Sequence, residues 1–575
     1  MLRRIFSYMK EYKKYAWLAL ICIGVEVVLE IMVPKLMADL IDIGVTNSDV
    51  PYIINKGIQM AVCAVAALIL GVGSARFSAL AGQGLGANIR KAEYEKLQSY
   101  SFSNIDHFSV SSLVTRLTSD VTNIQNAVST GMRPFGRSPV MLIFATTLAF
   151  QINSTLALVF LVALPVLAVL LIIIIINVGP RYGRMQGAVD LVNRCIEENL
   201  TAVRVVKSYV RGDYEIEKFG HVNDNLKNES EKAFGIAVLN MPAMQFVMYS
   251  TILGILLIGG RLINSGQMMI GQLTSFLSYV LLILNSLMMM SNVFLLMTRS
   301  LASAERIMKV IDEPIDITDE NARNIEVKKG EIEFNHVWFK YNETAKEYVL
   351  SDVSFHINAG QTVGIIGQTG SSKTTLIQLI PRLYDAGKGE IKIDGINVKE
   401  YPIRHLRDAI SVVLQKNTLF SGSLIDNLRW GDENATLDEI KEACSIACVD
   451  EFIDRLPGGL DAEMGQEGVN VSGGQKQRIC IARAILKKPK VLILDDSTSA
   501  VDTATEGKIR NALAKKLPDM TKIIIAQRIS SVCHADQIII MDGGCVDAIG
   551  THESLLKTNK IYQEIYESQK EGADL

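Results

Sequence analysis

Six apolar segments restrict the fold of this chain more than any other feature of its sequence. Each is close to or longer than the roughly 20 residues that an α-helix needs to cross a bilayer. In lipid, only helices and closed barrels satisfy their own backbone hydrogen bonds, and segments of this length suit helices. Buried helices of a large soluble core would explain neither the number of such segments nor the charges that flank them. We therefore predict a transmembrane domain over residues 1–300, with spans at about 16–42, 54–82, 132–152, 155–178, 239–261 and 272–298.

Lysine and arginine are distributed unevenly over the connections between these segments. The two long connections, at about 83–131 and 179–238, are rich in both residues, whereas the three short connections contain neither. Loops that carry Lys and Arg lie on the cytoplasmic side of a membrane. The sequence therefore predicts a multi-pass protein of the cytoplasmic membrane with both termini inside. The basic, aromatic segment 1–14 is predicted to be an amphipathic helix on the cytoplasmic face of the lipid bilayer.

Two acidic residues lie inside the first span. Glu26 and Glu30 are four positions apart, so they share one face of a helix. A lone carboxylate at mid-membrane costs about 2.5–3.5 kcal/mol, which favours either a wet cavity or basic partners. Arg76 of the second span is one candidate partner. Polar side chains of the sixth span could line the same cavity or simply pack between helices: Asn285, Ser286, Ser291 and Asn292.

The second half of the chain has a different composition. Residues 301–330 are charged and contain the sequence Asp312-Glu313-Pro314, which is typical of a linker, and residues 331–575 read as a soluble α/β domain. This half has no basic stripe with interleaved aromatic residues, so we expect no nucleic acid partner. The eight cysteines of the chain are scattered without a CxxC pair. They are therefore predicted to be buried free thiols, in keeping with a reducing compartment.

The soluble half contains a strand, a glycine-bearing loop and a helix in the order of a phosphate-binding loop. Residues 362–366 are strand-like, residues 375–380 are helix-like, and the loop between them ends in Lys373-Thr374. Backbone N–H groups of such a loop converge on phosphate oxygens, and the helix N-terminus adds about half a positive charge. Lys373 would reach the outer phosphates, and the Thr374 hydroxyl would hold Mg²⁺. An ordinary strand–turn–helix is the alternative.

One position of this loop departs from the usual pattern. Ser372 stands where a glycine is expected before the lysine. If the backbone needs a positive φ angle there, a serine costs free energy, and if it does not, the hydroxyl is harmless. We expect ATP to bind despite this substitution, because the other elements of the loop are present.

Further polar residues stand at the ends of predicted strands in the soluble half. In open α/β sheets, ligands bind at the carboxyl ends of the strands. Each of these residues alone is more often part of the scaffold than of a site, and only their joint presence indicates nucleotide chemistry. They are Gln415 after strand 410–414, Asp495 at the end of strand 491–495, Gln527 after strand 523–526, the signature-like Ser472-Gly473-Gly474-Gln475 before a basic helix, and Tyr341 ahead of the loop.

With these motifs in this order, the chain resembles a half-transporter of the ATP-binding cassette exporter family over essentially its full length. The resemblance implies six membrane helices followed by one α/β P-loop domain that binds ATP and Mg²⁺. It implies that Tyr341 stacks on the adenine, that Asp495 orders Mg²⁺, and that Gln415 senses Mg²⁺ and couples to the membrane domain. It also implies coupling helices near 106–113 and 209–219. The other implied binding residues are Gly367, Gln368, Thr369, Gly370, Ser371, Ser372, Lys373, Thr374 and Thr375 around the phosphates, with Ser472, Gly473, Gly474 and Gln475 in the signature.

Two positions differ from the family pattern. Asp496 stands where the family has a catalytic glutamate, and Gln527 stands where it has a histidine. The aspartate carboxylate sits about 1.5 Å short of the attacking water, and a misplacement near 1 Å can cost about 10²-fold in rate. Glutamine cannot carry a positive charge toward the γ-phosphate. The pair therefore resembles the degenerate half of a heterodimeric exporter, in which the partner chain supplies the working glutamate and histidine.

The leading interpretation is thus an ATP-driven exporter of small, amphipathic compounds that works with a different ATP-binding cassette chain. Two alternatives remain open. A homodimeric lipid flippase or drug pump would use Asp496 as its base, and an ATP-gated channel or regulatory subunit would tolerate a degenerate site. Glu26 and Glu30 hint at cationic cargo. The sequence identifies neither the cargo nor the partner chain.

Overall fold

The computed structural model describes residues 1–496 and 501–571, with the side chains of a few further residues left out. The chain divides into two compact units. The first comprises residues 1–97 and 111–312, and the second comprises residues 98–110 and 313–575.

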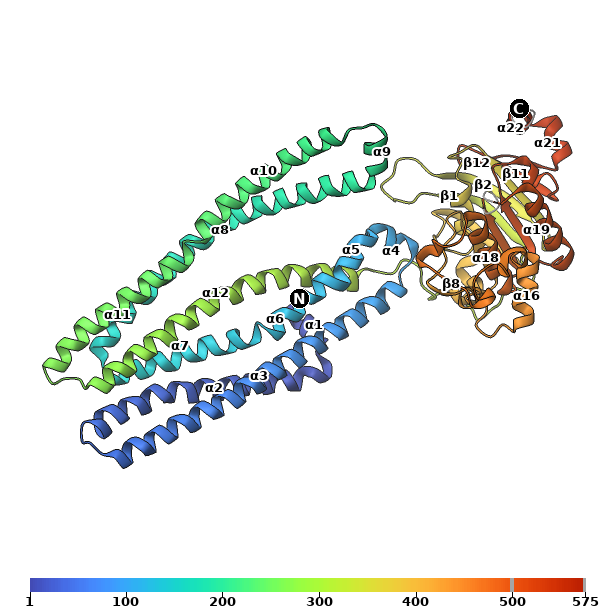
Figure 1. The fold of residues 1–575 in the computed structure, drawn as a ribbon. Coiled ribbons are helices and arrows are strands. Elements are labelled where there is room, and N and C mark those ends of the chain that lie inside the picture. Colours follow the sequence, from blue (N-terminus) through green and yellow to red (C-terminus); the bar gives the residue numbers. More distant parts are fainter. Residues whose placement is uncertain (497–500, 572–575) are drawn as a thin grey trace. The chain divides into compact units, whose positions relative to one another are not determined.

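The first unit is built from helices (Figure 1). Among the described residues, five stretches are long and apolar enough to cross a membrane. The fourth predicted span lies in α8, where several side chains are not described. The side chains of Ser291 and Asn292 in α12 also lie outside the described residues. The main helices are α1 (Leu2–Ser7), α2 (Lys13–Asp39), α3 (Val50–Gln98), α5 (Val110–Thr115), α6 (Val121–Ser129), α7 (Met132–Ile152), α8 (Ser154–Thr201), α9 (Val203–Ser208), α10 (Gly212–Ala237), α11 (Asn240–Asn264) and α12 (Ile270–Asp312).

Three of these helices are much longer than a bilayer is thick. Helices α3, α8 and α12 contain 49, 48 and 43 residues. At about 1.5 Å per residue, each is more than twice as long as the roughly 30 Å hydrocarbon core. The long connections of the sequence are therefore helical extensions of the spans, as predicted. Helix α12 continues to Asp312, so residues 301–312 belong to this helix rather than to the expected linker at 301–330.

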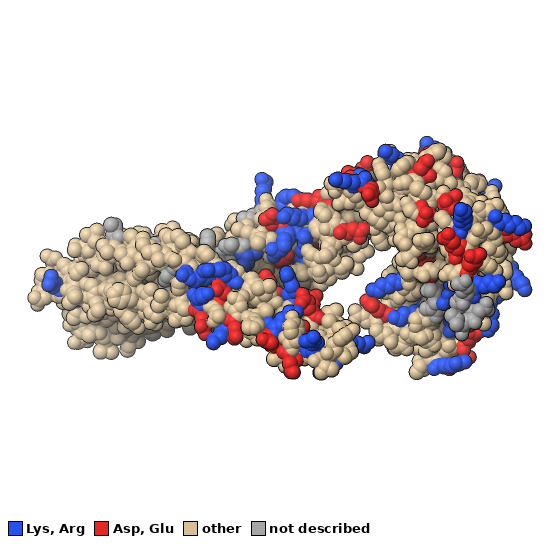
Figure 2. Space-filling view, turned by 90° about the horizontal axis from the view of Figure 1, so that it is seen from above, with Lys and Arg blue, Asp and Glu red and all other residues tan. Residues whose placement is uncertain are grey.

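Charge is segregated along the first unit. Figure 2 shows one face on which charged side chains are almost absent from the end that holds the α2–α3, α7–α8 and α11–α12 connections. A buried cluster of apolar residues from α2, α7, α8, α11 and α12 fills that end, and within it the Tyr279 hydroxyl donates to the Ile31 carbonyl at 3.0 Å. Outward-facing apolar side chains in such a region indicate contact with lipid.

The second unit contains two sheets. A six-stranded sheet has the order β12-β11-β3-β10-β9-β6, and all its neighbours are parallel except β11 and β12. A four-stranded antiparallel sheet has the order β2-β1-β4-β5. The strands are β1 (Ile332–Phe339), β2 (Leu350–Ile357), β3 (Thr362–Gly367), β4 (Lys388–Ile393), β5 (Ile396–Asn397), β6 (Ile410–Val413), β9 (Val491–Asp495), β10 (Thr521–Ile525), β11 (Gln537–Asp542) and β12 (Cys545–Gly550).

Helices surround the parallel sheet, whose strands are buried and therefore read as continuous apolar runs. The small pair β7 (Gly422–Ser423) and β8 (Glu463–Met464) lies apart from it. Helix α4 (Phe102–His107) also belongs to this unit, because Tyr384 donates to Asp106 at 2.6 Å. The remaining helices are α13 (Lys373–Leu379), α14 (Ile403–Asp408), α15 (Leu424–Arg429), α16 (Leu437–Ile446), α17 (Asp450–Ile453), α18 (Gly473–Leu486), α19 (Thr503–Lys516), α20 (Ile529–Val532), α21 (His552–Thr558) and α22 (Lys560–Glu571).

The cysteines differ from the expectation in part. Cys195, Cys444, Cys448 and Cys480 are buried thiols, whereas Cys545 is exposed beside a glycine turn. Burial raises the pKa of the Cys444 thiol to about 12, so it is unreactive at neutral pH.

Candidate nucleotide site

The loop after β3 has the geometry of a phosphate-binding loop. Strand β3 ends at Gly367, and α13 begins at Lys373. A side chain on Gly367 would lie 2.2 Å from the Met541 carbonyl oxygen, so only glycine fits at this close approach. The Lys373 ammonium donates to the carbonyls of Gly367 and Gln368, both at 2.8 Å. The lysine thus caps its own loop, and burial lowers its pKa.

Ser372 has a positive φ angle, which is the case in which a serine costs free energy at this position. Its φ of 70° and ψ of 22° lie in the left-handed region, where a non-glycine residue costs about 1–2 kcal/mol. Gly370, with a φ of 87°, is also left-handed, and a side chain there would meet nothing within 4 Å. The loop therefore keeps its shape with serine in place of glycine, at a cost in stability.

The carboxylate of Asp495 faces the start of α13. Asp495 ends β9, is 2% exposed, and accepts a hydrogen bond from the Thr374 hydroxyl at 3.2 Å. Its other oxygen has no hydrogen-bond partner among the described residues, and burial raises its pKa. A hydroxyl and an incompletely paired carboxylate are the hard oxygen ligands that suit Mg²⁺. The donor set of Thr374 and Asp495 therefore fits this ion.

The two residues that depart from the family pattern touch each other. Strands β9 and β10 are parallel neighbours, so the residues that follow them meet at one edge of the sheet. The side-chain amide of Gln527 donates to Asp496 Oδ2 at 2.8 Å. Burial raises the pKa of Asp496, while hydrogen bonds with Gln527 and Gln415 oppose that rise. Gln415 thus belongs to the same group of side chains.

Tyr341 lies next to α13, on the same side as the phosphate loop. Its hydroxyl is 3.0 Å from Thr375 Oγ1 and donates to Gln378 at 3.2 Å. Phe339 and Tyr384 support the ring edge-on, and the residue is 47% exposed. One face of the ring is therefore available for a planar ligand.

The signature segment begins α18, a helix of 14 residues. Ser472 accepts a hydrogen bond from the backbone N–H of Gln475 at 3.3 Å, and the Gln475 side chain accepts one from the Ser472 N–H at 2.9 Å. This capping box leaves the N–H groups of Gly473 and Gly474 at a helix N-terminus, where anions are favoured. None of the hydrogen bonds between described residues joins this segment to the phosphate loop.

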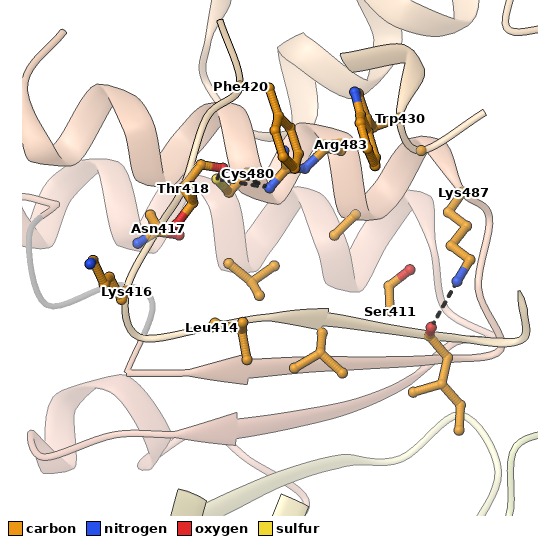
Figure 3. A pocket seen from close by; sticks show the side chains of 15 residues that line it. Ser411, Leu414, Lys416, Asn417, Thr418, Phe420, Trp430, Cys480, Arg483 and Lys487 are labelled. Atoms are coloured by element: carbon orange, nitrogen blue, oxygen red, sulfur yellow. Dashed lines mark hydrogen bonds between the residues drawn. The ribbon is translucent and has the colours of Figure 1, made fainter. Parts of the chain in front are cut away.

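A cavity of about 370 Å³ is lined by the residues on both sides of Gln415, from Ile410 to Leu414 and from Lys416 onward (Figure 3). It lies between β6 and α18, and the rings of Phe420 and Trp430 stack at its rim with centroids 4.2 Å apart. Arg483 donates to the Thr418 carbonyl at 3.1 Å, and Lys487 donates to the Ile410 carbonyl at 3.2 Å. Cationic and aromatic groups therefore share one surface, which the sequence did not indicate.

The acidic pair of the first span has partners that the sequence analysis missed. Arg133 Nη2 lies 2.6 Å from Glu26 Oε1, and Arg137 reaches Glu26 at 3.2 Å and Glu30 at 2.7 Å. Among the described residues, the ion pairs of these carboxylates are with Arg133 and Arg137 and not with the exposed Arg76, so the expectation for Arg76 is wrong. The spacing of Arg133 and Arg137, four residues apart like the two glutamates, was the overlooked signal. Paired carboxylates give no support to cationic cargo.

Comparison with known proteins agrees with this geometry. The family model of the ABC transporter transmembrane region matches residues 16–287, and a second family model, described as ABC transporter, matches residues 350–499. The fold is similar to a bacterial Atm1-family ABC exporter solved with ATP bound, with a TM-score of 0.83 over 97% of this chain and 99% of that chain. At 22% identity, that likeness concerns the fold alone.

Relatives in sequence span nearly the whole chain. The uncharacterized ABC transporter ATP-binding protein YfiB of Bacillus subtilis is 38% identical over 100% of both chains. The ATP-dependent lipid A-core flippase of Pseudomonas putida is 32% identical over 98% of this chain and 95% of its own. Bacillus subtilis YgaD, an ATP-binding/permease protein whose name refers to multidrug export, is 32% identical over 84% of this chain and 83% of its own. This chain is a member of the ABC exporter family, a half-transporter with one transmembrane domain and one ATP-binding domain.

Proposed function

We propose that this chain is the degenerate half of a heterodimeric exporter that uses ATP to move small, amphipathic compounds out across the cytoplasmic membrane. Its termini and its ATP-binding domain would lie in the cytoplasm. The direct contact between Asp496 and Gln527 carries the proposal. The two positions at which the family has its catalytic glutamate and histidine hold a short carboxylate bonded to a neutral amide, and both face the phosphate loop's edge of the sheet.

This contact bears on catalysis in two ways. A carboxylate that accepts a hydrogen bond from Gln527 has one acceptor position fewer and is a weaker base toward an attacking water. The amide of Gln527 stays neutral at every physiological pH, so it cannot stabilise charge on the γ-phosphate as a protonated histidine can. Binding does not depend on these groups. Lys373, the loop N–H groups, Thr374 and Asp495 would hold ATP with Mg²⁺, and Tyr341 would stack on the base.

The intact signature points to a second, working site. Ser472, Gly473 and Gly474 present a capped helix N-terminus that no described contact connects to this chain's own phosphate loop. We infer that it completes a site on the partner's phosphate loop, where the partner supplies the catalytic glutamate. Hydrolysis would then occur mainly at that composite site, while ATP at this chain's loop holds the two domains together.

The cavity in Figure 3 suits a cytoplasmic segment of the partner's membrane domain. In this chain the corresponding segment, 209–219, exposes Tyr209, Val210 and Ile216 together with the acidic Asp213. Such a tip is complementary to a surface with Trp430, Phe420 and Arg483. We propose that the partner's equivalent tip docks there, so that closure of the ATP-binding domains moves the membrane helices.

A homodimeric pump or lipid flippase is the second candidate. The name of the Pseudomonas putida relative favours it, and it requires Asp496 to act as the base. An ATP-gated channel is a further function that a degenerate site allows. Two measurements on the reconstituted complex separate it from a pump: step currents in single-channel recording indicate a channel, and accumulation of cargo in vesicles indicates a pump.

Steady-state ATP hydrolysis by the purified complex separates the two dimers. In the heterodimer, Asp496→Asn should cost little activity, because this site contributes little. Gly473→Glu should remove nearly all activity, since its carboxylate would face the γ-phosphate bound by the partner. In a homodimer both substitutions sit in every working site and both should be severe. A loss from Asp496→Asn comparable with that from Gly473→Glu would falsify the degenerate-half proposal.

A further inference from the structure

A second polar cavity of about 350 Å³ lies in the ATP-binding unit, near the amino ends of the strands whose carboxyl ends lead into the nucleotide site. The nucleotide residues follow the carboxyl ends of β3, β9 and β10, whereas this cavity is lined by the first residue of β3 and the second residue of β10. Helix α19 and the segment that contains α20 form its other walls. Cavities of this size accommodate small metabolites. Its polar lining residues are Thr362, Arg510, Asn511, Lys522, Ser531 and His534.

Lys522 of β10 lines this cavity and is 4% exposed. An ammonium group has three N–H donors, and the hydrogen bond that it makes among the described residues is to the Met520 carbonyl at 2.8 Å. Burial lowers the pKa of Lys522, while the carboxylates of Asp519 and Asp536 oppose that shift. A buried ammonium with remaining donors is costly unless an anion approaches it.

Two further cationic or ionisable groups reach the same space from different elements. Arg510 of α19 uses one nitrogen for the Ser530 carbonyl at 3.1 Å, which leaves the other guanidinium donors. His534 follows α20 and is exposed. Among the described residues that line the cavity, none is acidic. Asp536 lies beyond the lining, where it accepts the Thr362 N–H at 2.8 Å.

The rest of the lining defines the class of ligand. The hydroxyls of Thr362 and Ser531 add donors, while Leu513, Ile524 and Ala535 provide an apolar wall. Donors that converge from three elements suit the tetrahedral oxygens of a phosphate group, and the apolar wall suits a short carbon skeleton. We propose that this cavity binds a small phosphate-bearing metabolite, at a site distinct from the ATP site. The proposal does not depend on which dimer the chain forms.

Thermal unfolding of the full-length complex in detergent tests this site, with inorganic phosphate as the probe. The ATP sites are first filled with Mg²⁺ and a non-hydrolysable ATP analogue, so that phosphate cannot act through them. Phosphate should raise the Tm saturably. The concentration at half-saturation should increase about tenfold or more in Lys522→Met and in Arg510→Gln, since each removes a charge-assisted hydrogen bond. Lys516→Met, an exposed change on the same helix, should stay within about twofold.

Three results would overturn the proposal. They are the absence of a saturable rise in the unsubstituted complex, an unchanged half-saturation in both Lys522→Met and Arg510→Gln, and a phosphate response that disappears in Lys373→Ala but persists in Lys522→Met. If Lys522→Met does not fold, Arg510→Gln decides alone, because Arg510 is only partly buried. The second of these results, together with a lower starting Tm in Lys522→Met, would mean that the lysine is structural.

Discussion

The conformation of Ser372 sets the first expectation at the scale of single residues. A serine held at a φ of 70° loses stability that a glycine would not lose, yet the Lys373 ammonium and the loop N–H groups remain in place. We therefore predict that a photoreactive azido-ATP labels this chain in the assembled complex, and that Ser372→Gly labels at least as strongly. Lys373→Ala should lose most of the labelling. Absence of labelling in the unsubstituted complex would show that the serine closes the pocket.

The Asp496–Gln527 contact allows a repair experiment. In a complex silenced by Gly473→Glu in this chain, hydrolysis at the partner's phosphate loop is blocked, so any remaining activity comes from this chain's own loop. Adding Asp496→Glu and Gln527→His should restore hydrolysis there, because it extends the carboxylate by about 1.5 Å and supplies a group that can be protonated. We expect an increase of up to about 10²-fold in the residual rate.

The measurement is ATP turnover at saturating ATP, compared with the silenced complex alone. The single change Gln527→His is the matched control, since it replaces the neutral amide donor by a group that can be protonated without lengthening the carboxylate. An equal rate in the silenced and repaired complexes would mean that residues other than these two limit hydrolysis at this site.

At the scale of elements, the four charged groups on α2 and α7 join two membrane helices. Glu26 has a side chain that is 6% exposed and lies between Arg133 and Arg137. Gly71 of α3 makes room for this pair, since a side chain there would approach Glu26 Oε1 at 3.1 Å and Arg133 Nη2 at 3.2 Å. Removing Glu26 leaves Arg133 without its partner, and because the Arg133 side chain is 39% exposed, we expect a cost below the roughly 3–5 kcal/mol of a fully buried unpaired charge.

We therefore predict that Glu26→Gln lowers the Tm of the purified complex more than the double change Glu26→Gln with Arg133→Gln. In the double variant neither helix carries the unpaired charge, and Arg137 keeps Glu30 as its partner. Thermal unfolding in detergent measures both. If the double variant is the less stable of the two, the pair acts through its attraction rather than through mutual neutralisation.

The elements also show what the sequence could and could not predict. Strand ends such as Asp495 and Gln527 were placed correctly, because buried parallel strands are continuous apolar runs and their carboxyl ends share one edge. The partners of Glu26 were missed because Arg133 and Arg137 lie inside the predicted third span, and the sequence does not show which spans pack side by side. The positive φ of Ser372 could be stated only as a condition, since backbone angles depend on the loop around them. Lys522 belongs to the apolar strand β10, and the sequence does not show that its side chain is buried.

At the scale of the whole molecule, the orientation of the chain in the membrane is still an expectation from the distribution of Lys and Arg. The α2–α3 and α11–α12 connections belong to the end of the first unit that is almost free of charge, which places them outside the cell if the long helical extensions lie inside (Figure 2). Single cysteines at exposed sites of a cysteine-free variant test this directly. Cysteines in place of Ser48 and Ser265 probe the short connections, and cysteines in place of Ser109 and Gly212 probe the long ones.

In intact cells, a membrane-impermeant thiol reagent should label the cysteines at positions 48 and 265 and leave those at 109 and 212 unlabelled. After the cells are opened, all four should react, which controls for accessibility. An even number of spans returns the chain to the side of the membrane on which it began. If positions 109 or 212 react from outside in sealed cells, the model with six spans and both termini inside is wrong. The ATP-binding domain would then lack access to cytoplasmic ATP, and an ATP-driven exporter would be excluded with it.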